Sequence, residues 1–221
     1  MYQSIKKEIF SALKKNLVPG LVLQLFAGAI VCIYFFVPQS QPAFAVFSDL
    51  KKTYGLIYAF ISTAFFGGLI PFLYLHFSNS FRSQENYGRL FFFYIFFWGL
   101  KGMEVDLFYQ FQAYIFGTGN DIKTILCKTF FDQLLYSTFW AAPGITIIYL
   151  WVENNFEWSK TRAAMTPTFF RVKIPTVILS NWMVWFPAVS IVYTMPSDLQ
   201  IPLFNLVLCF WVLLLAVLNK K

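Results

Sequence analysis

Three charged side chains, Lys101, Glu104 and Asp106, interrupt an apolar run at residues 90–116. A charge at the centre of a transmembrane helix costs about 2.5–3.5 kcal/mol on the insertion scale, so three unpaired charges would oppose insertion. Lys101 and Glu104 are three residues apart and share a helical face, which permits a mutual ion pair. We therefore expect these charges to be paired or to contact water.

Asp106 points roughly 140° away from Lys101 at about 100° per residue, so it faces a different neighbour. Residues at helical spacings share its face, namely Gly99, Gly102, Tyr109 and Ala113. Such a seam lets a second helix backbone approach closely, with Asp106 as a buried polar contact. Lining of a solvated path and a proton relay are the other two interpretations of this carboxylate.

A second polar group opens the next apolar run, where Lys128 and Asp132 are four residues apart and Gln133 follows. Asp132 can pair with Lys128, although Lys before Asp is the weaker order on a helix, or it can reach a neighbouring span. Gln133, Ser137 and Gly144 form a small, polar stripe. These side chains are candidates for lining a pathway or bracing helices.

The apolar stretch 175–211 carries two amides, Asn181 and Asn205. Three tryptophans accompany them, Trp182, Trp185 and Trp211. As one helix the stretch would be roughly 55 Å long, against about 30 Å for the hydrocarbon core of a bilayer. It must therefore turn back or break. Buried amides are costly without partners, so both should face other helices or water.

Catalytic chemistry has little support in the sequence. His76 is the only histidine and has no carboxylate or cysteine close to it in the chain. The cysteines lack the spacing of a metal site, at Cys32, Cys127 and Cys209. An intramembrane lipid or isoprenoid enzyme would need more than Glu104 and Asp106. We predict no catalytic residue, no cofactor and no metal site.

Composition indicates the elements that must position these residues. The chain is 58% hydrophobic and only 12% charged, whereas soluble domains have about 25% charged residues. We predict an all-α polytopic transmembrane helix bundle, with a basic amphipathic segment at 1–16 and one helical domain at 17–218. Six spans are expected, at residues 17–37, 54–76, 90–116, 125–152, 175–194 and 199–218. Pro187 or Pro196 could instead make the last two a single broken, partly interfacial element.

Basic residues predict the orientation. With six spans, the loops on one side carry twelve of them: Lys6, Lys7, Lys14, Lys15, Arg82, Arg89, Lys160, Arg162, Arg171, Lys173, Lys220 and Lys221. The other side carries four: Lys51, Lys52, Lys123 and Lys128. This asymmetry predicts both termini on the internal side. Nucleic-acid binding is not favoured, because the net charge of +7 is spread over short loops.

Three blocks of residues carry a resemblance to a known family. They are Gly99-x-x-Gly102 with Asp106, Phe108-Tyr109 and Phe116-Gly117; Lys128-x-x-x-Asp132-Gln133; and Pro175-Thr176, Asn181-Trp182-x-x-Trp185-Phe186-Pro187, Met195-Pro196, Asn205 and Trp211. On these residues the chain resembles the Mpv-seventeen and peroxisomal 22-kilodalton membrane proteins over roughly residues 88–218. Met103 and Asp106 replace the family's proline and histidine, and Gln200 stands where an arginine is expected, as in a divergent member. The resemblance leaves open which of the first two spans, 17–37 or 54–76, is added to the part that matches the family.

The resemblance implies a channel-like or pore-forming protein for passive passage of small solutes, in a family linked to metabolite homeostasis. The alternative is a non-conducting structural or assembly protein in which the same polar residues only hold helices together. The expected membrane is the mitochondrial inner membrane, another organelle membrane, or a bacterial inner membrane. The expected partners are the lipid bilayer and small-molecule solutes, and a homo-oligomer is left open.

Overall fold

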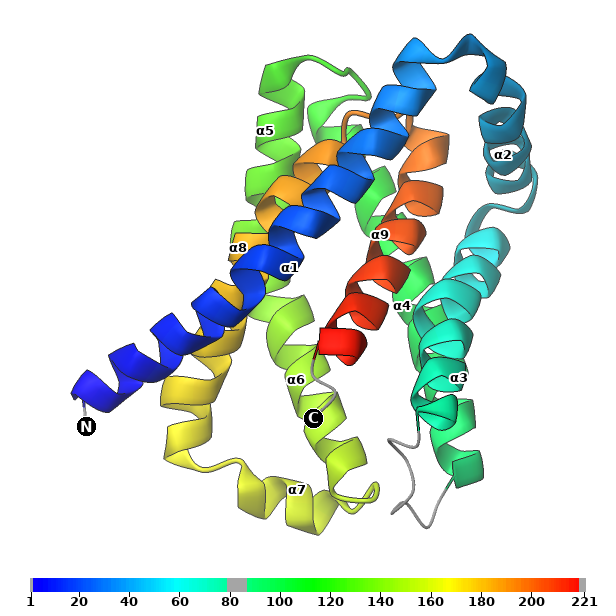
Figure 1. Ribbon diagram of the computed structural model, residues 1–221. Coiled ribbons are helices and arrows are strands. Elements are labelled where there is room, and N and C mark those ends of the chain that lie inside the picture. The colour runs from blue at the N-terminus through cyan, green and yellow to red at the C-terminus, as the bar shows by residue number, and fades with distance from the viewer. Residues whose placement is uncertain (1, 79–86, 219–221) are drawn as a thin grey trace. The chain divides into compact units, whose positions relative to one another are not determined.

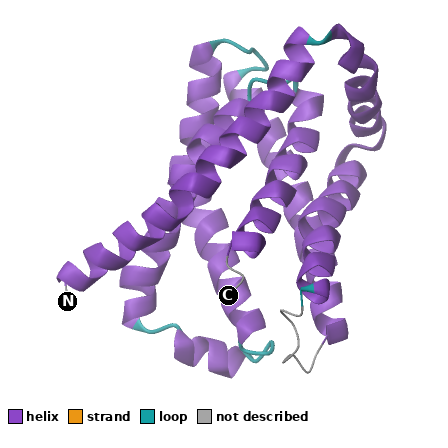
Figure 2. Ribbon diagram, viewed as in Figure 1, coloured by secondary structure: helices purple, strands orange, loops and turns teal. Residues whose placement is uncertain are grey.

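The computed structural model describes residues 2–78 and 87–218, and these residues form helices and no strand (Figure 2). The α-helices are α1 (Tyr2–Phe36), α2 (Gln41–Thr63), α3 (Ile70–Phe77), α4 (Tyr87–Phe116), α5 (Ile122–Phe130), α6 (Ala142–Glu153), α7 (Trp158–Ala164), α8 (Ile174–Val192) and α9 (Ser197–Leu218). A 3₁₀ turn, η1, spans Pro38–Ser40. Three π-helical segments continue the α-helices, η2 (Ala64–Leu69), η3 (Phe131–Ala141) and η4 (Phe169–Lys173). The predicted all-α class is confirmed.

Five helical segments in the described part of the chain are long and apolar enough to cross a membrane. They are Leu13–Phe36, Pro38–Phe77, Ile122–Glu153, Phe169–Val192 and Ser197–Leu215. The predicted span 90–116 lies in α4, whose 30 residues suffice in length but carry the charges discussed above. The chain is therefore a polytopic membrane protein, and α4 is a long helix that is not among these five apolar segments.

The stretch 175–211 forms two helices, α8 and α9, separated by a turn that ends at Pro196. Proline disfavours helical conformation in the residue before it, which explains why the break falls here. Pro187 lies inside α8 and does not end it. Of the two arrangements expected for this stretch, the structure has two separate spans.

Gly55 breaks the long segment between Pro38 and Phe77. Its φ of 50° and ψ of −120° interrupt α2, so residues 41–54 and 56–63 form two helices (Figure 1). Glycine alone adopts this conformation without strain from a Cβ. The span predicted at 54–76 corresponds to the apolar helix after the break, and residues 41–54 are a short additional helix.

The backbone contacts divide the chain into two compact units, each described by itself below. Unit 1 comprises Met1–Leu21 and Thr129–Pro187, and unit 2 comprises Val22–Lys128 and Ala188–Lys221. Within unit 2, α4 packs along α2 and η2, and α9 also contacts these elements. Unit 1 contains η3, α6, α7 and the greater part of α8.

The predicted small-residue seam of α4 is the contact surface with α2. A Cβ added at Gly102 would lie 2.5 Å from the carbonyl oxygen of Ala59, and one at Gly99 would overlap the ring of Phe60. The backbones of η2 and α4 are also close, since a Cβ added at Gly68 of η2 would lie 2.7 Å from the carbonyl oxygen of Tyr94 in α4. Two backbones can approach this closely only where side chains are missing.

Candidate functional site

A network of buried amides and hydroxyls joins η3 to α8 within unit 1. The Asn181 amide donates to the Ser137 hydroxyl at 2.8 Å and to Gln133 Oε1 at 3.3 Å. The Gln133 amide in turn donates to Asp132 Oδ1 at 2.9 Å. Asp132, Gln133 and Ser137 are all buried. We call Asp132, Gln133, Ser137, Asn181 and Trp182 the unit 1 polar cluster.

The π-helical form of η3 explains how Trp182 joins this cluster. A π-helix displaces the regular i to i−4 bonds, and side chains can then bond the carbonyls. The Gln133 carbonyl accepts hydrogen bonds from Trp182 Nε1 at 2.9 Å and from Thr138 Oγ1 at 2.7 Å. The indole N–H of Trp182 thus connects α8 to the backbone of η3.

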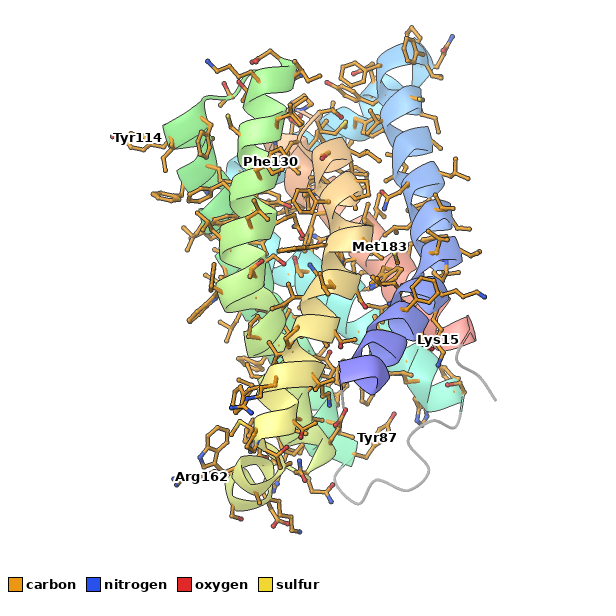
Figure 3. The ribbon with its side chains drawn as sticks, turned by 90° about the vertical axis from the view of Figure 1, so that its left-hand side faces the viewer. Lys15, Tyr87, Tyr114, Phe130, Arg162 and Met183 are labelled. Carbon is orange, nitrogen blue, oxygen red and sulfur yellow. The ribbon has the colours of Figure 1, made fainter. Side chains whose placement is uncertain are left out.

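Apolar contacts hold the same two segments together beside the cluster. Figure 3 shows α8, labelled at Met183, beside the chain that starts at Phe130 and continues into η3. The rings of Phe130 and Phe186 lie 5.6 Å apart in an edge-to-face arrangement. This ring contact adds an apolar connection between the same segments that the polar cluster joins.

Lys128 has a neighbour that the sequence does not suggest. Its ammonium lies 5.9 Å from the centre of the Tyr193 ring, within unit 2, and the side chain is 2% exposed. Asp132, its predicted partner, accepts a hydrogen bond from the Gln133 amide in unit 1. Attraction between an ammonium and the ring face is worth about 2 kcal/mol or more when desolvated.

Asp106 forms an ion pair with Lys51, a residue predicted to lie in a loop. Lys51 Nζ is 3.0 Å from Asp106 Oδ2, and both side chains are nearly inaccessible, at 10% and 4% exposure. Gln110 donates a second hydrogen bond to this carboxylate at 3.2 Å. The loop assignment of Lys51 and Lys52 is wrong, because both lie on the helix 41–54. That assignment follows from their position between the predicted spans 17–37 and 54–76.

Lys101 and Glu104 form the ion pair permitted by their spacing. Lys101 Nζ lies 2.5 Å from Glu104 Oε1, with the lysine more buried than the carboxylate. Lys101 is therefore neutralised by Glu104 and not by Asp106. This agrees with the position of Asp106 on a different face of α4, where it pairs with Lys51.

Asn205 joins α9 to α2 through two hydroxyls. Its Oδ1 accepts from Thr63 Oγ1 at 2.7 Å, and its Nδ2 donates to Ser62 Oγ at 2.8 Å. The adjacent cavity of about 70 Å³ is lined almost entirely by apolar side chains. Asn205 therefore has its hydrogen bonds within the protein and faces no polar cavity.

In addition to the pair between Lys51 and Asp106, Asp198 at the start of α9 makes a second connection to helix 41–54. Its carboxylate accepts a hydrogen bond from Ser48 and lies 3.1 Å from Lys52 Nζ. Sequence reasoning missed Ser48, Ser62 and Thr63 as well as both lysine partners, because nothing in local spacing connects them to α4 or α9.

The two other candidate tryptophans, Trp185 on α8 and Trp211 on α9, are half-buried. Among the described residues, no three His, Cys, Asp or Glu side chains come together as a metal site. Outside the apolar segments, Asp121 precedes α5 and accepts hydrogen bonds from the Thr124 hydroxyl at 2.6 Å and from its backbone N–H at 3.0 Å. The hydroxyl bond first, and then the backbone bond, lower the pKa of the Asp121 carboxyl.

Comparisons with known proteins add no relative. No protein-family model, curated protein or solved structure matches this chain.

Proposed function

We propose that this chain is an integral membrane protein through which small solutes pass passively, as a divergent member of the Mpv-seventeen type. The observation that carries the proposal is the unit 1 polar cluster, in which a carboxylate, two amides and a hydroxyl meet between two apolar spans. A membrane anchor has no need of such groups, because polar side chains in apolar spans are costly. They are therefore candidates for contacts with a polar solute.

Among the candidates, we propose Asp132, Gln133 and Asn181 as the pathway residues. In unit 2 the charged groups form direct ion pairs, Lys51 with Asp106 and Lys101 with Glu104, which suits a bracing role. In unit 1 the contacts are between amides, hydroxyls and one carboxylate, groups that can exchange partners with water or a solute at a smaller cost.

The proposed passage is passive, because the sequence contains no nucleotide-binding motif. Both termini are proposed to face the internal side, and the burial of Lys51 and Lys128 supports this by removing two lysines from the loops of the less basic side. The proposed location is the mitochondrial inner membrane or another organelle membrane, or the inner membrane of a bacterium.

Planar-bilayer recording of the purified protein tests the proposal. Asn181→Asp and Gln133→Glu each place a carboxylate in the cluster, so they should shift the reversal potential toward cation selectivity. Asn154→Asp is the matched control, since Asn154 bonds only the carbonyl of Leu150 in its own helix. Absence of conductance across varied voltage, pH and redox conditions, or equal shifts in all three variants, would contradict the pathway.

The second candidate is a non-conducting structural or assembly protein, and the contacts of Asn205 favour it. The Asn205 amide is 1% exposed and bonded to Thr63 and Ser62, as expected of a helix brace. If the unit 1 polar cluster has this role too, Asn181→Asp will lower stability and no folded variant will conduct.

A further inference from the structure

Unit 1 contains an open hollow of about 470 Å³ near the start of the η4–α8 segment. Side chains from α6, α7, η4 and α8 line it. Figure 1 shows α7 between the end of α6 and the beginning of the η4–α8 segment. Its volume falls in the range of small-molecule sites, about 300–1,000 Å³. The hollow shares no lining residue with the unit 1 polar cluster.

The polar groups that line the hollow are hydrogen-bond donors. Lys173 contributes an ammonium, held 5.7 Å from the centre of the Phe169 ring, which is buried. The hydroxyl of Thr166 accepts a bond from the Phe169 backbone N–H at 3.3 Å, so its own proton is available for donation. Thr168 adds another hydroxyl. Thr176 also lines the hollow, but its hydroxyl already donates to the Val172 carbonyl at 2.8 Å. None of the lining residues is acidic, so no carboxylate of the hollow repels an anionic ligand.

The surrounding chain is strongly basic. Between Asn154 and Thr176 there are four basic residues, Lys160, Arg162, Arg171 and Lys173. Glu157 is the only acidic residue in this stretch, and it is paired with Lys160 at 2.8 Å. Figure 3 shows Arg162 at the outer end of α7, directed away from the helices. The local potential therefore favours an anion.

We propose that this hollow binds a phosphate group, through the Lys173 ammonium and the hydroxyls of Thr166 and Thr168. A phosphate monoester presents several strong acceptor oxygens, which match an ammonium and two hydroxyls. The apolar side chains of the hollow, such as Leu150 and Val177, accommodate the remainder of the ligand. Because the hollow opens at the start of the apolar segment Phe169–Val192, a lipid headgroup or a free phosphate ester can supply this group.

Binding is tested on the full-length protein in nanodiscs of phosphatidylcholine. One arm adds phosphatidic acid and measures retained lipid by native mass spectrometry, and the other adds glycerol phosphate or inorganic phosphate and measures thermal stabilisation. Retention of phosphatidic acid alone assigns a lipid headgroup, and stabilisation by the soluble compounds assigns a free phosphate ester.

Three exposed residues give a matched set of variants, Lys173→Gln, Arg171→Gln and Lys160→Gln, each removing one positive charge. Only Lys173 lines the hollow. Lys173→Gln should weaken binding roughly ten-fold, as expected for a hydrogen bond to a charged group. The other two should weaken it by about two-fold or less at 0.15 M salt, because screening reduces the effect of charges beyond roughly 8 Å.

Thr168→Val, which keeps the side-chain shape, should weaken binding without loss of folding, and circular dichroism checks the fold of each variant. Equal weakening by all three charge variants would show diffuse electrostatic attraction and overturn the proposal. Absence of binding in both arms would overturn it as well. Neither readout depends on conductance, so the passage proposal can fail independently.

Discussion

The ammonium of Lys51 lies 3.0 Å from the carboxylate of Asp106, and this pair joins the short helix 41–54 to the middle of α4. The two charges neutralise each other in a nearly inaccessible site. The cost of inserting Asp106 into an apolar environment is thereby offset by a partner on a different helix.

Lys51→Met should destabilise the protein by about 3–5 kcal/mol, because it leaves the Asp106 carboxylate buried without its counter-ion. The free energy of unfolding in detergent, measured by denaturant titration, checks this value. Lys52→Met is the control, since the Lys52 ammonium is 63% exposed in its pair with Asp198 and an exposed pair contributes about 1 kcal/mol or less. The double variant Lys51→Met with Asp106→Leu should recover much of the lost free energy of unfolding, because it leaves no buried unpaired charge. If it does not, loss of the ion pair is not the cause of the destabilisation.

Gly102→Ala should lower stability by about 1–3 kcal/mol, because the added methyl group would press on the backbone carbonyl of Ala59 and the side chain of Thr63. Gly28→Ala is a suitable control, since a Cβ there meets nothing within 4 Å and Gly28 is also helical. The midpoints of thermal unfolding of both variants test this prediction. Similar midpoints would show that α2 and α4 can separate without cost.

Trp182→Phe should lower the free energy of unfolding by about 1 kcal/mol, the net value of one hydrogen bond, because the bond from the indole N–H to the Gln133 carbonyl is lost while Thr138 still donates to that carbonyl. Trp158→Phe is the corresponding change at an exposed tryptophan of the same unit and should be within about 0.5 kcal/mol of neutral. Chemical unfolding monitored by fluorescence of the remaining tryptophans provides the measurement. A Trp182 variant as stable as the control would argue against a bracing contact at η3.

The Asp121 carboxyl should titrate below its ordinary pKa of 3.8, with the Thr124 hydroxyl as the main cause. Because the folded pKa is depressed, the stabilising contribution is present above the unfolded pKa and is lost as the pH falls through the folded pKa. Thr124→Val should raise the pKa of Asp121 toward 3.8, as followed by NMR of the carboxyl carbon. Thr146→Val, whose hydroxyl bonds Ala142, should leave that titration unchanged.

Features governed by short sequence distances were predictable. The apolar runs indicated the spans, the spacing of Gly99 and Gly102 with Asp106 predicted the contact face of α4, and the separation of Lys101 and Glu104 permitted their ion pair. Each of these depends on helical periodicity, which residues three or four apart express directly.

Features that join distant segments were not predictable from one sequence. Lys51 and Lys52 fall between two predicted spans, a position that indicates a loop, and only the packed fold places them against Asp106 and Asp198. The π-helical form of η3 was also absent from the prediction, because its residues have no distinct local pattern. Without it, the role of Trp182 as a donor to a backbone carbonyl could not be inferred.

The break at Gly55 has a consequence for biosynthesis. Lys51 is translated long before Asp106, so the counter-ion that makes its burial tolerable does not yet exist when the preceding helices enter the bilayer. Because Gly55 separates the helix 41–54 from the apolar helix that follows, this short helix can wait at the membrane surface with its lysines in water. Docking of helix 41–54 must then follow translation of α4, which makes it a late step of assembly that is separate from membrane insertion.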